Sequence, residues 1–258
     1  MWRLSLPLVL RAAAAVTTNR VTGMPIDAGL FDAVLFDCDG VLVDSERITN
    51  GVLRAMLHEL GWELTEAESF RLFVGRALAD EVGVITANTG FVVTPEWIAE
   101  FRSRRDAALA SSVQPIPGAV AAVHEVDRLF GGNVACASGA DRPKIELQLT
   151  KIGLDGVFAG KIFSGMEMAR SKPAPDVYLA AAAALGVDPA RAAVVEDTPT
   201  GVVAGVTAGA TVYGYCPPGS LAHNEPRVLV EAGATHIFTD MAELPALLRA
   251  ASAARARS

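Results

Sequence analysis

The chain has 258 residues, of which 51% are hydrophobic and 20% are charged, and its formal net charge is −7. This apolar content excludes a disordered chain and is sufficient for one large domain, or for a core with a smaller insert. The sequence contains no basic tract, which argues against a nucleic-acid partner. An acidic protein that binds an anion must instead create a local positive site from a metal ion or a few placed donors.

Residues 1–29 are predicted to form an N-terminal extension, without regular structure, that lies outside the fold. Residues 4–16 (LSLPLVLRAAAAV) also have a weak likeness to an export signal, although Arg11 interrupts the apolar run. The run is too short and too broken to span a membrane. We therefore expect no membrane partner.

Strands and helices alternate along most of the remaining chain. Strands are predicted at 33–40, 133–138, 161–165, 192–198, 211–216 and 235–239. Helices are predicted at 118–130, 143–154, 175–186 and 200–210, with a closing helix from Met241 that Pro245 interrupts. This alternation, with nearly continuous apolar strands, predicts an α/β fold: a Rossmann-like parallel sheet with helices on both faces.

The stretch between the first two predicted strands breaks this alternation. Its four segments have helical spacing, and none has the pattern of a good strand. We therefore predict an all-helical cap domain at residues 47–114, inserted into a core formed by residues 30–46 and 115–250. Such an insert would sit above the carboxyl ends of the strands.

The three cysteines, Cys38, Cys136 and Cys216, form no CxxC pair, and each lies in or beside an apolar run. This usage is typical of small buried side chains in a reducing compartment. We therefore expect a cytoplasmic protein. The sequence carries no signal of oligomeric state.

Asp37 and Asp39 lie two residues apart at the end of the first predicted strand, so their side chains can face the same way. Their mutual repulsion calls for a cation or for a proton on one of them. Mg²⁺ prefers such oxygen ligands. The ionised carboxylate can act as a nucleophile, and a protonated one as a general acid. Taken alone, a pair of this type is better explained as two solvated acids in a loop.

Other polar residues also follow predicted strands: Ser138, Ser164, Glu196 and Asp197. Ligands on parallel sheets bind outside the carboxyl ends of the strands. We therefore expect these side chains to converge with the Asp37–Asp39 pair at one edge of the sheet.

Four motifs occur in a fixed order. They are FDCDGVLVDSE at 36–46, Ser138 at a strand end, Lys172 in SKPAPDVY, and Glu196-Asp197 in VVEDTPTG. This set resembles the haloacid dehalogenase-like (HAD) hydrolase superfamily, in the branch with a helical cap after the first strand. The resemblance covers residues 33 to about 245. The motifs and the segment TVYGYCPPG are most similar to those of sugar-phosphate and phosphogluconate phosphatases.

The resemblance implies roles for the carboxylates. Asp37 is the nucleophile, becomes an aspartyl phosphate and binds Mg²⁺. Asp39 is the acid/base, and its backbone carbonyl is a magnesium ligand. Asp197 binds the metal directly, and Glu196 supports it directly or through water.

The resemblance also implies phosphoryl-binding roles. Ser138 donates to a phosphoryl oxygen, and Lys172 binds the phosphoryl group and orients Asp37. Gly139 stands where many relatives carry Asn, so its backbone N–H remains but the amide contact is lost. Dehalogenases of the superfamily lack the acid at the Asp39 position, so its presence favours phosphate chemistry.

The cap is expected to select the substrate. Gly75 lies at a predicted helix break beside Arg76, which either binds substrate oxygens or is a solvated charge. Relatives with β-phosphoglucomutase activity carry a His where Thr49 stands and an Arg where Leu78 stands. Both differences weaken a mutase assignment.

These observations predict a Mg²⁺-dependent phosphatase whose partner is a small phosphorylated metabolite, such as a sugar phosphate. A β-phosphoglucomutase-like isomerase, which returns the phosphoryl group to sugar, is the alternative. A third hypothesis is a catalytically silent protein that binds phosphometabolites. The complete set Asp37, Asp39, Lys172 and Asp197 argues against it.

Overall fold

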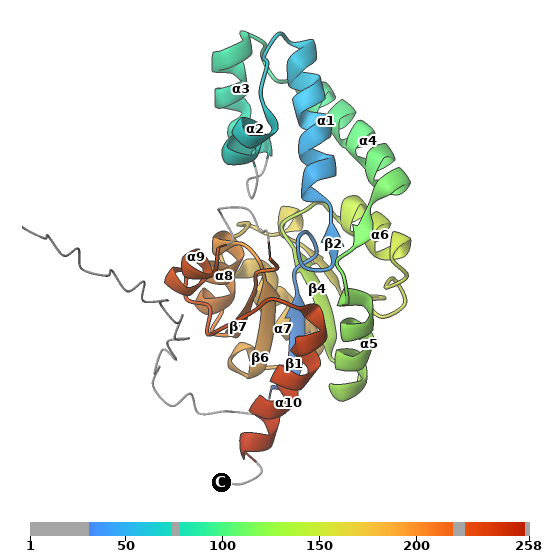
Figure 1. The fold of residues 1–258 in the computed structure, drawn as a ribbon, viewed down its shortest axis with the longest axis vertical. Coiled ribbons are helices and arrows are strands. Elements are labelled where there is room, and N and C mark those ends of the chain that lie inside the picture. Colours follow the sequence, from blue (N-terminus) through green and yellow to red (C-terminus); the bar gives the residue numbers. More distant parts are fainter. Residues whose placement is uncertain (1–30, 74–77, 219–224, 256–258) are drawn as a thin grey trace, which may run out of the picture.

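The fold comes from a computed structural model that describes residues 31–73, 78–218 and 225–255 (Figure 1). The predicted extension at residues 1–29 lies outside these ranges. None of the described helices is both long enough and apolar enough to cross a membrane.

Six parallel strands form the central sheet of the described chain, in the order β5-β4-β1-β6-β7-β8. Their bounds are β1 (Ala33–Phe36), β4 (Val134–Ser138), β5 (Ile162–Ser164), β6 (Ala192–Glu196), β7 (Thr211–Tyr215) and β8 (His236–Phe238). All six predicted strands are confirmed. The strand order reverses beside β1, which lies between β4 and β6, and ligands bind at such switch points.

Helices cover both faces of the sheet. Side chains of β1 alternate, so that Val34 and Phe36 enter one core cluster and Leu35 enters the other. The first face is covered by α5 (Ala119–Leu129), α6 (Arg142–Lys151) and α10 (Leu244–Arg255), and the second by α7 (Asp176–Leu185), α8 (Pro199–Thr207) and α9 (Pro226–Glu231). Leu35 and Phe36 are at most 1% exposed, and burial of each such side chain stabilises the fold by about 2 kcal/mol.

The segment between β1 and β4 is helical, as predicted. It contains α1 (Glu46–Glu59), α2 (Glu66–Phe73), a 3₁₀ helix (Leu78–Glu81), α3 (Val82–Thr89) and α4 (Pro95–Ser112). These helices share a separate apolar cluster that includes Leu53, Met56, Leu57, Phe73, Ile85 and Phe101. They rise above the sheet at one end of the molecule (Figure 1). We retain the division into a cap at 47–114 and a core at 30–46 and 115–250 as a proposal.

A short antiparallel pair, β2 (Val43–Asp44) and β3 (Gln114–Pro115), joins the two chain passages between cap and core. This pair was not predicted, because two-residue strands are too short to produce a periodic pattern.

The predicted interruption of the closing helix is wrong. Helix α10 begins at Leu244, so Pro245 lies in its first turn, where a missing N–H removes no intrahelical hydrogen bond. Short 3₁₀ helices at Gly165–Glu167, Pro189–Arg191 and Met241–Glu243 complete the described elements.

Candidate active site

The polar residues at neighbouring strand ends converge. Asp37 follows β1, Ser138 ends β4 on one side, and Glu196 ends β6 on the other. Asp37, Ser138 and Glu196 line one pocket, together with Asp39, Gly139 and Lys172. Ser164 does not line it. Its hydroxyl donates to the Ala140 carbonyl at 2.6 Å and so supports the loop after Ser138.

Lys172 holds the nucleophile candidate in place. Its Nζ lies 2.6 Å from Asp37 Oδ1 and 2.7 Å from Glu196 Oε1, and it also donates to the Ala137 carbonyl and the Tyr178 hydroxyl. The Lys172 side chain is 9% exposed. Burial alone would lower the pKa of Lys172, but the charges of Asp37 and Glu196 outweigh it, so the pKa is raised. The ammonium therefore remains charged at the centre of the site.

Asp37, Glu196 and Asp197 form a buried carboxylate cluster, in which one oxygen from each lies within 4.8 Å of the others. Burial raises the pKa of Asp37 to about 7 against the lowering effect of Lys172. Burial also raises the pKa of Asp197 well above its usual value, and the Glu196 charge adds to this effect. Oδ1 of Asp197 is buried without a hydrogen-bond partner among the described residues.

The three carboxylates of this cluster share one ammonium. Lys172 is paired with Asp37 and Glu196 but not with Asp197. A buried carboxylate needs a counter-charge, because desolvation strongly penalises an uncompensated anion. Closely spaced carboxylate oxygens suit a hard divalent cation. The residues present therefore fit such an ion, held first by Asp37 and Asp197.

Glu196 is occupied in a different way. Its Oε1 accepts from Lys172 and Tyr178, and its Oε2 accepts from the backbone N–H groups of Asp197 and Thr198 and from the Thr198 hydroxyl. These donors use the lone pairs of both oxygens. A direct metal contact of Glu196 stays a prediction, as does one through the Asp39 carbonyl. The observed contacts give Glu196 the task of holding Lys172.

Glycine is required where the backbone passes these carboxylates. A Cβ on Gly201 would lie 1.6 Å from Glu196 Oε1, and one on Gly40 would lie 2.0 Å from Asp197 Oδ2. Gly40 also has a φ of +77°, which strains other residues. The glycines in DG (39–40) and TG (200–201) therefore allow the loops to approach the acidic cluster.

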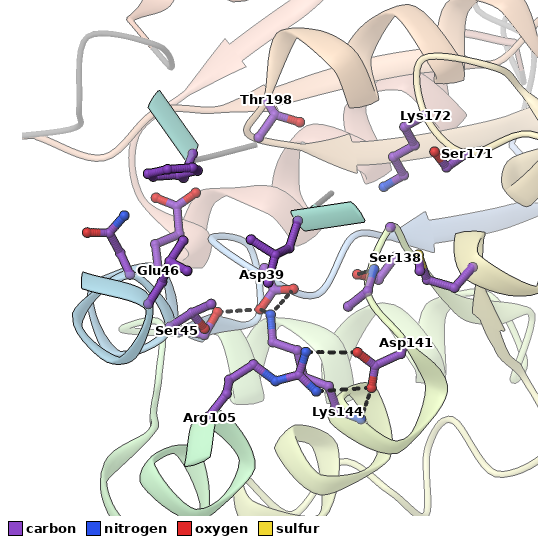
Figure 2. Close-up of a pocket in the computed structure, with 18 of the residues that line it drawn as sticks. Asp39, Ser45, Glu46, Arg105, Ser138, Asp141, Lys144, Ser171, Lys172 and Thr198 are labelled. Carbon is purple, nitrogen blue, oxygen red and sulfur yellow. Dashed lines mark hydrogen bonds and ion pairs between the residues drawn. The ribbon is translucent and has the colours of Figure 1, made fainter. Parts of the chain in front are cut away.

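Asp39 points to a different set of partners (Figure 2). Lys144 Nζ lies 2.8 Å from each Asp39 oxygen, Gln148 Nε2 donates to Oδ1 at 2.9 Å, and the Ser45 hydroxyl donates to the same oxygen. Burial by itself would raise the pKa of Asp39, but the Lys144 charge and these hydrogen bonds lower it overall. The two aspartates are thus held by separate lysines, Lys172 and Lys144.

The cap contributes the other wall of the pocket. Leu53, Phe73, Leu78 and Phe101 supply apolar surface, and Arg102 and Arg105 supply charge. Arg105 forms a bidentate pair with Asp141 on the core, at 2.8 and 3.1 Å. The Arg102 Nε lies 4.0 Å from Asp141, and its side chain is 44% exposed. Among the described cations of the pocket, Arg102 therefore has the weakest contact with a carboxylate. Gly75 and Arg76 lie outside the described residues.

Five residues of the site were not predicted from the sequence: Ser45, Arg102, Arg105, Lys144 and Gln148. A signal for two of them exists in α6, whose buried face carries Lys144, Ile145, Gln148 and Leu149. Polar residues four apart on an apolar helix face are neighbours and must have polar partners. No comparable pattern marks the arginines, because α4 carries three of them and only their position relative to the core distinguishes them.

Residues 31–209 match the family model described as haloacid dehalogenase-like hydrolase, which is more than half of the chain. The chain belongs to this family. The predicted membership is confirmed, and so is the Rossmann-like α/β fold with a helical insert.

The chain is also similar to named phosphatases and to solved structures. 6-Phosphogluconate phosphatase from Escherichia coli strain K12 is 31% identical over 221 residues, covering 85% of this chain and 95% of the relative. Hexitol phosphatase B from the same strain is 29% identical, covering 77% and 88%. A solved HAD family hydrolase from Deinococcus radiodurans R1, with bound phosphate and sodium, is 35% identical. Its TM-score is 0.70, and the alignment covers 86% of this chain and 97% of that one.

Proposed function

We propose that this protein is a Mg²⁺-dependent phosphoric monoester hydrolase that acts on a small sugar phosphate or related metabolite through an aspartyl phosphate on Asp37. The observation that carries the proposal is the environment of Asp37. Its carboxylate contacts Lys172 and lies within 4.8 Å of the Asp197 carboxylate, whose Oδ1 has no hydrogen-bond partner among the described residues. The names of the two curated relatives support a phosphorylated sugar or polyol as substrate. A cytoplasmic location stays a prediction.

In this mechanism Lys172 performs the orienting step. Its contact with Asp37 Oδ1 fixes the carboxylate, and its charge offsets the negative charge of the incoming phosphoryl group. Ser138 and Gly139 line the pocket at the end of β4, and the Ser138 hydroxyl and the Gly139 backbone N–H would donate to phosphoryl oxygens. When bound by Asp37 and Asp197, Mg²⁺ would supply further charge neutralisation to the phosphoryl oxygens.

Asp39 performs the proton transfers. Asp39 carries a proton when the substrate is bound, gives it to the leaving oxygen as Asp37 attacks phosphorus, and regains one from the water that hydrolyses the aspartyl phosphate. The different contacts of the two aspartates support this division of roles, since Asp37 is paired with Lys172 and Asp39 with Lys144.

The choice of water rather than sugar as acceptor rests on two residues of the cap segment, Thr49 in α1 and Leu78 in the 3₁₀ helix. Thr49 lines the pocket where the mutase resemblance requires His, and its hydroxyl has no hydrogen-bond partner among the described residues. Leu78, which also lines the pocket, stands where an Arg is required. Neither side chain can hold a sugar phosphate by charge for the return step.

The first prediction concerns metal and product. With Mg²⁺, the protein is expected to release inorganic phosphate from sugar and hexitol phosphates, and a chelator should stop this release until Mg²⁺ is restored. The buried Asp197 explains the requirement. The measurement is phosphate release across a panel of phosphorylated metabolites that includes β-glucose 1-phosphate. Full activity in metal-free buffer, or formation of glucose 6-phosphate instead of free phosphate, would contradict the proposal.

The second prediction concerns Arg102, which we assign to the distal end of the substrate. An exposed guanidinium in the pocket suits a carboxylate, such as that of a phosphorylated sugar acid. Arg102→Ala should therefore lower kcat/KM for a sugar-acid phosphate by about 10- to 100-fold, the effect of losing a hydrogen bond to a charged group. A neutral hexitol phosphate should be little affected. Steady-state kinetics on both substrates measure this difference.

Arg104→Ala is the matched control, because Arg104 lies on the same helix but pairs with Glu59 and Glu100 within the cap. Arg102 would not be a substrate-binding residue if Arg102→Ala lowered kcat/KM equally for both substrates. The same conclusion would follow if Arg104→Ala also lowered kcat/KM selectively for the sugar-acid phosphate.

A further inference from the structure

We propose that Lys144 and Gln148 are positioning residues for Asp39, and that the Arg105–Asp141 ion pair makes this positioning depend on the cap. This inference rests on the proposed phosphatase function, since it concerns the residue that transfers the protons. Lys144 and Gln148 act through Asp39 and are not catalytic residues themselves.

The contacts of Asp39 define its direction. Lys144 Nζ reaches both carboxylate oxygens at 2.8 Å, and Gln148 Nε2 and the Ser45 hydroxyl both bind Oδ1. Lys144, Gln148 and Ser45 are 7%, 0% and 1% exposed. Donors from two elements therefore converge on one carboxylate, with little water to compete. Such a set fixes the χ angles of Asp39 far better than a single contact would.

Gln148 is itself held. Its Oε1 lies 3.4 Å from the thiol of Cys38, the residue between the two aspartates. This contact returns from α6 to the loop that carries Asp39. The amide group is thereby oriented with its Nε2 toward Asp39. Lys144 and Gln148 together form a clamp on the Asp39 carboxylate.

Both clamp residues belong to the first two turns of α6. Asp141 is the N-cap of this helix, and its carboxylate accepts from the Lys144 backbone N–H at 3.3 Å. Lys144 and Gln148 are four residues apart and so lie on one face. A displacement of the start of α6 would therefore move both donors relative to Asp39.

The cap holds this same helix start. Arg105, on α4 of the cap, binds both oxygens of Asp141 and is 5% exposed (Figure 2). Its Nε binds Asp106 at 2.8 Å, which fixes the guanidinium from its own helix. Buried bidentate pairs are geometrically specific. The Arg105–Asp141 pair therefore fixes the start of α6 when the cap is seated on the core.

These contacts form a continuous path from α4 through Asp141 and α6 to Asp39. When the cap is seated, the clamp aims Asp39 at the position of the leaving oxygen. When the Arg105–Asp141 pair is broken, α6 loses an anchor and Asp39 is held less well. General acid catalysis depends on this geometry, because the acid must lie within hydrogen-bond distance of the leaving oxygen.

The test compares two substrates that differ in their need for a general acid. A hexitol phosphate has a poor leaving group, whereas nitrophenyl phosphate has a good one. The ratio of their kcat/KM values reports the acid step and cancels general damage to the site. Lys144→Met is expected to lower kcat/KM for the hexitol phosphate by about 10²-fold, the low end for loss of a general acid. The loss for nitrophenyl phosphate should be at most a few-fold.

Gln148→Met is the second variant, because Lys144→Met leaves Asp39 without its cation and can fail to fold. This substitution keeps the side-chain volume and removes one donor to Asp39. We therefore expect kcat/KM to fall more for the hexitol phosphate than for nitrophenyl phosphate, by a smaller factor than in Lys144→Met. Lys151→Met, at the exposed end of α6, is the control and should match the wild type. If Gln148→Met lowered kcat/KM equally for both substrates, or for neither, the positioning role would be overturned.

Arg105→Ala tests the link to the cap, with Arg104→Ala as its neighbour on α4. Arg105→Ala should show the same leaving-group preference as the clamp variants, and Arg104→Ala should not. Combining Arg105→Ala with Gln148→Met should give less than the product of the single effects, since both act on Asp39. Fully multiplicative effects would overturn the link.

Wild-type activity separates this inference from the proposed function. If the wild-type protein with Mg²⁺ hydrolyses neither substrate, the proposed function has failed. If the wild type hydrolyses both substrates and the clamp variants lower kcat/KM equally for the two, the phosphatase assignment stands and the positioning role alone is wrong.

Discussion

Asp37→Asn should abolish the turnover of every phosphate ester, including esters with good leaving groups. An amide is a poor nucleophile, so no aspartyl phosphate can form. The expected loss in kcat is on the order of 10⁶-fold, as for removal of the nucleophile from other hydrolases. Lys172 would keep its contacts with Glu196 and Tyr178, so the site should remain assembled. Single-turnover assays with nitrophenyl phosphate should show no burst of nitrophenol.

A second measurement on this variant checks the metal site. Mg²⁺ that binds the native state raises the Tm of the wild type, and removal of the Asp37 charge should reduce this shift. Without Mg²⁺ the variant should be no less stable than the wild type, since burial already disfavours the Asp37 carboxylate. Asp155→Asn, an exposed aspartate outside the pocket, is the control and should retain activity. A burst of normal size in Asp37→Asn would exclude Asp37 as the nucleophile.

Asp39→Asn should separate formation of the aspartyl phosphate from its hydrolysis. Nitrophenolate leaves without protonation, so this substrate should still give a burst of nitrophenol close to one equivalent. Hydrolysis then slows, because no base accepts the proton of the attacking water. Sugar phosphates need the acid for the first step and should give almost no burst. Loss of the acid–base group costs on the order of 10²–10⁴ in rate.

The burst must be measured alongside folding. Asp39→Asn leaves Lys144 with an amide in place of its carboxylate partner, so the Tm of the variant should be recorded first. Normal turnover of sugar phosphates by a folded Asp39→Asn variant would show that another group transfers the proton.

The site residues at the strand ends were predictable because the sequence pattern that marks them is local. Asp37, Ser138 and Glu196 each end or follow an apolar run, and parallel strands bring such residues to one edge. The metal fit followed from the carboxylates alone. The order in which β1, β4 and β6 lie side by side was not predicted, although it is what places Asp37 at the centre.

The contacts between cap and core were not predictable in this way. Arg105 and Asp141 are 36 positions apart, and neither belongs to a motif. Their pairing depends on how α4 lies against α6, which side-chain packing decides and local periodicity does not reveal. The Lys144–Asp39 pair spans 105 positions. The pattern of polar residues on the buried face of α6 is present in the sequence, but it does not identify Asp39 as their partner.

The paired strands β2 and β3 place the exit from the core beside the return. Val43 pairs with Pro115, Asp44 pairs with Gln114, and the Ile116 N–H donates to the Leu42 carbonyl at 2.9 Å. Insertions are tolerated where their two ends lie close together. A different cap could therefore replace this one during evolution without disturbing the strand ends that carry the chemistry. Arg105 sets a condition on such an exchange, since a new cap would have to bring its own cation to Asp141.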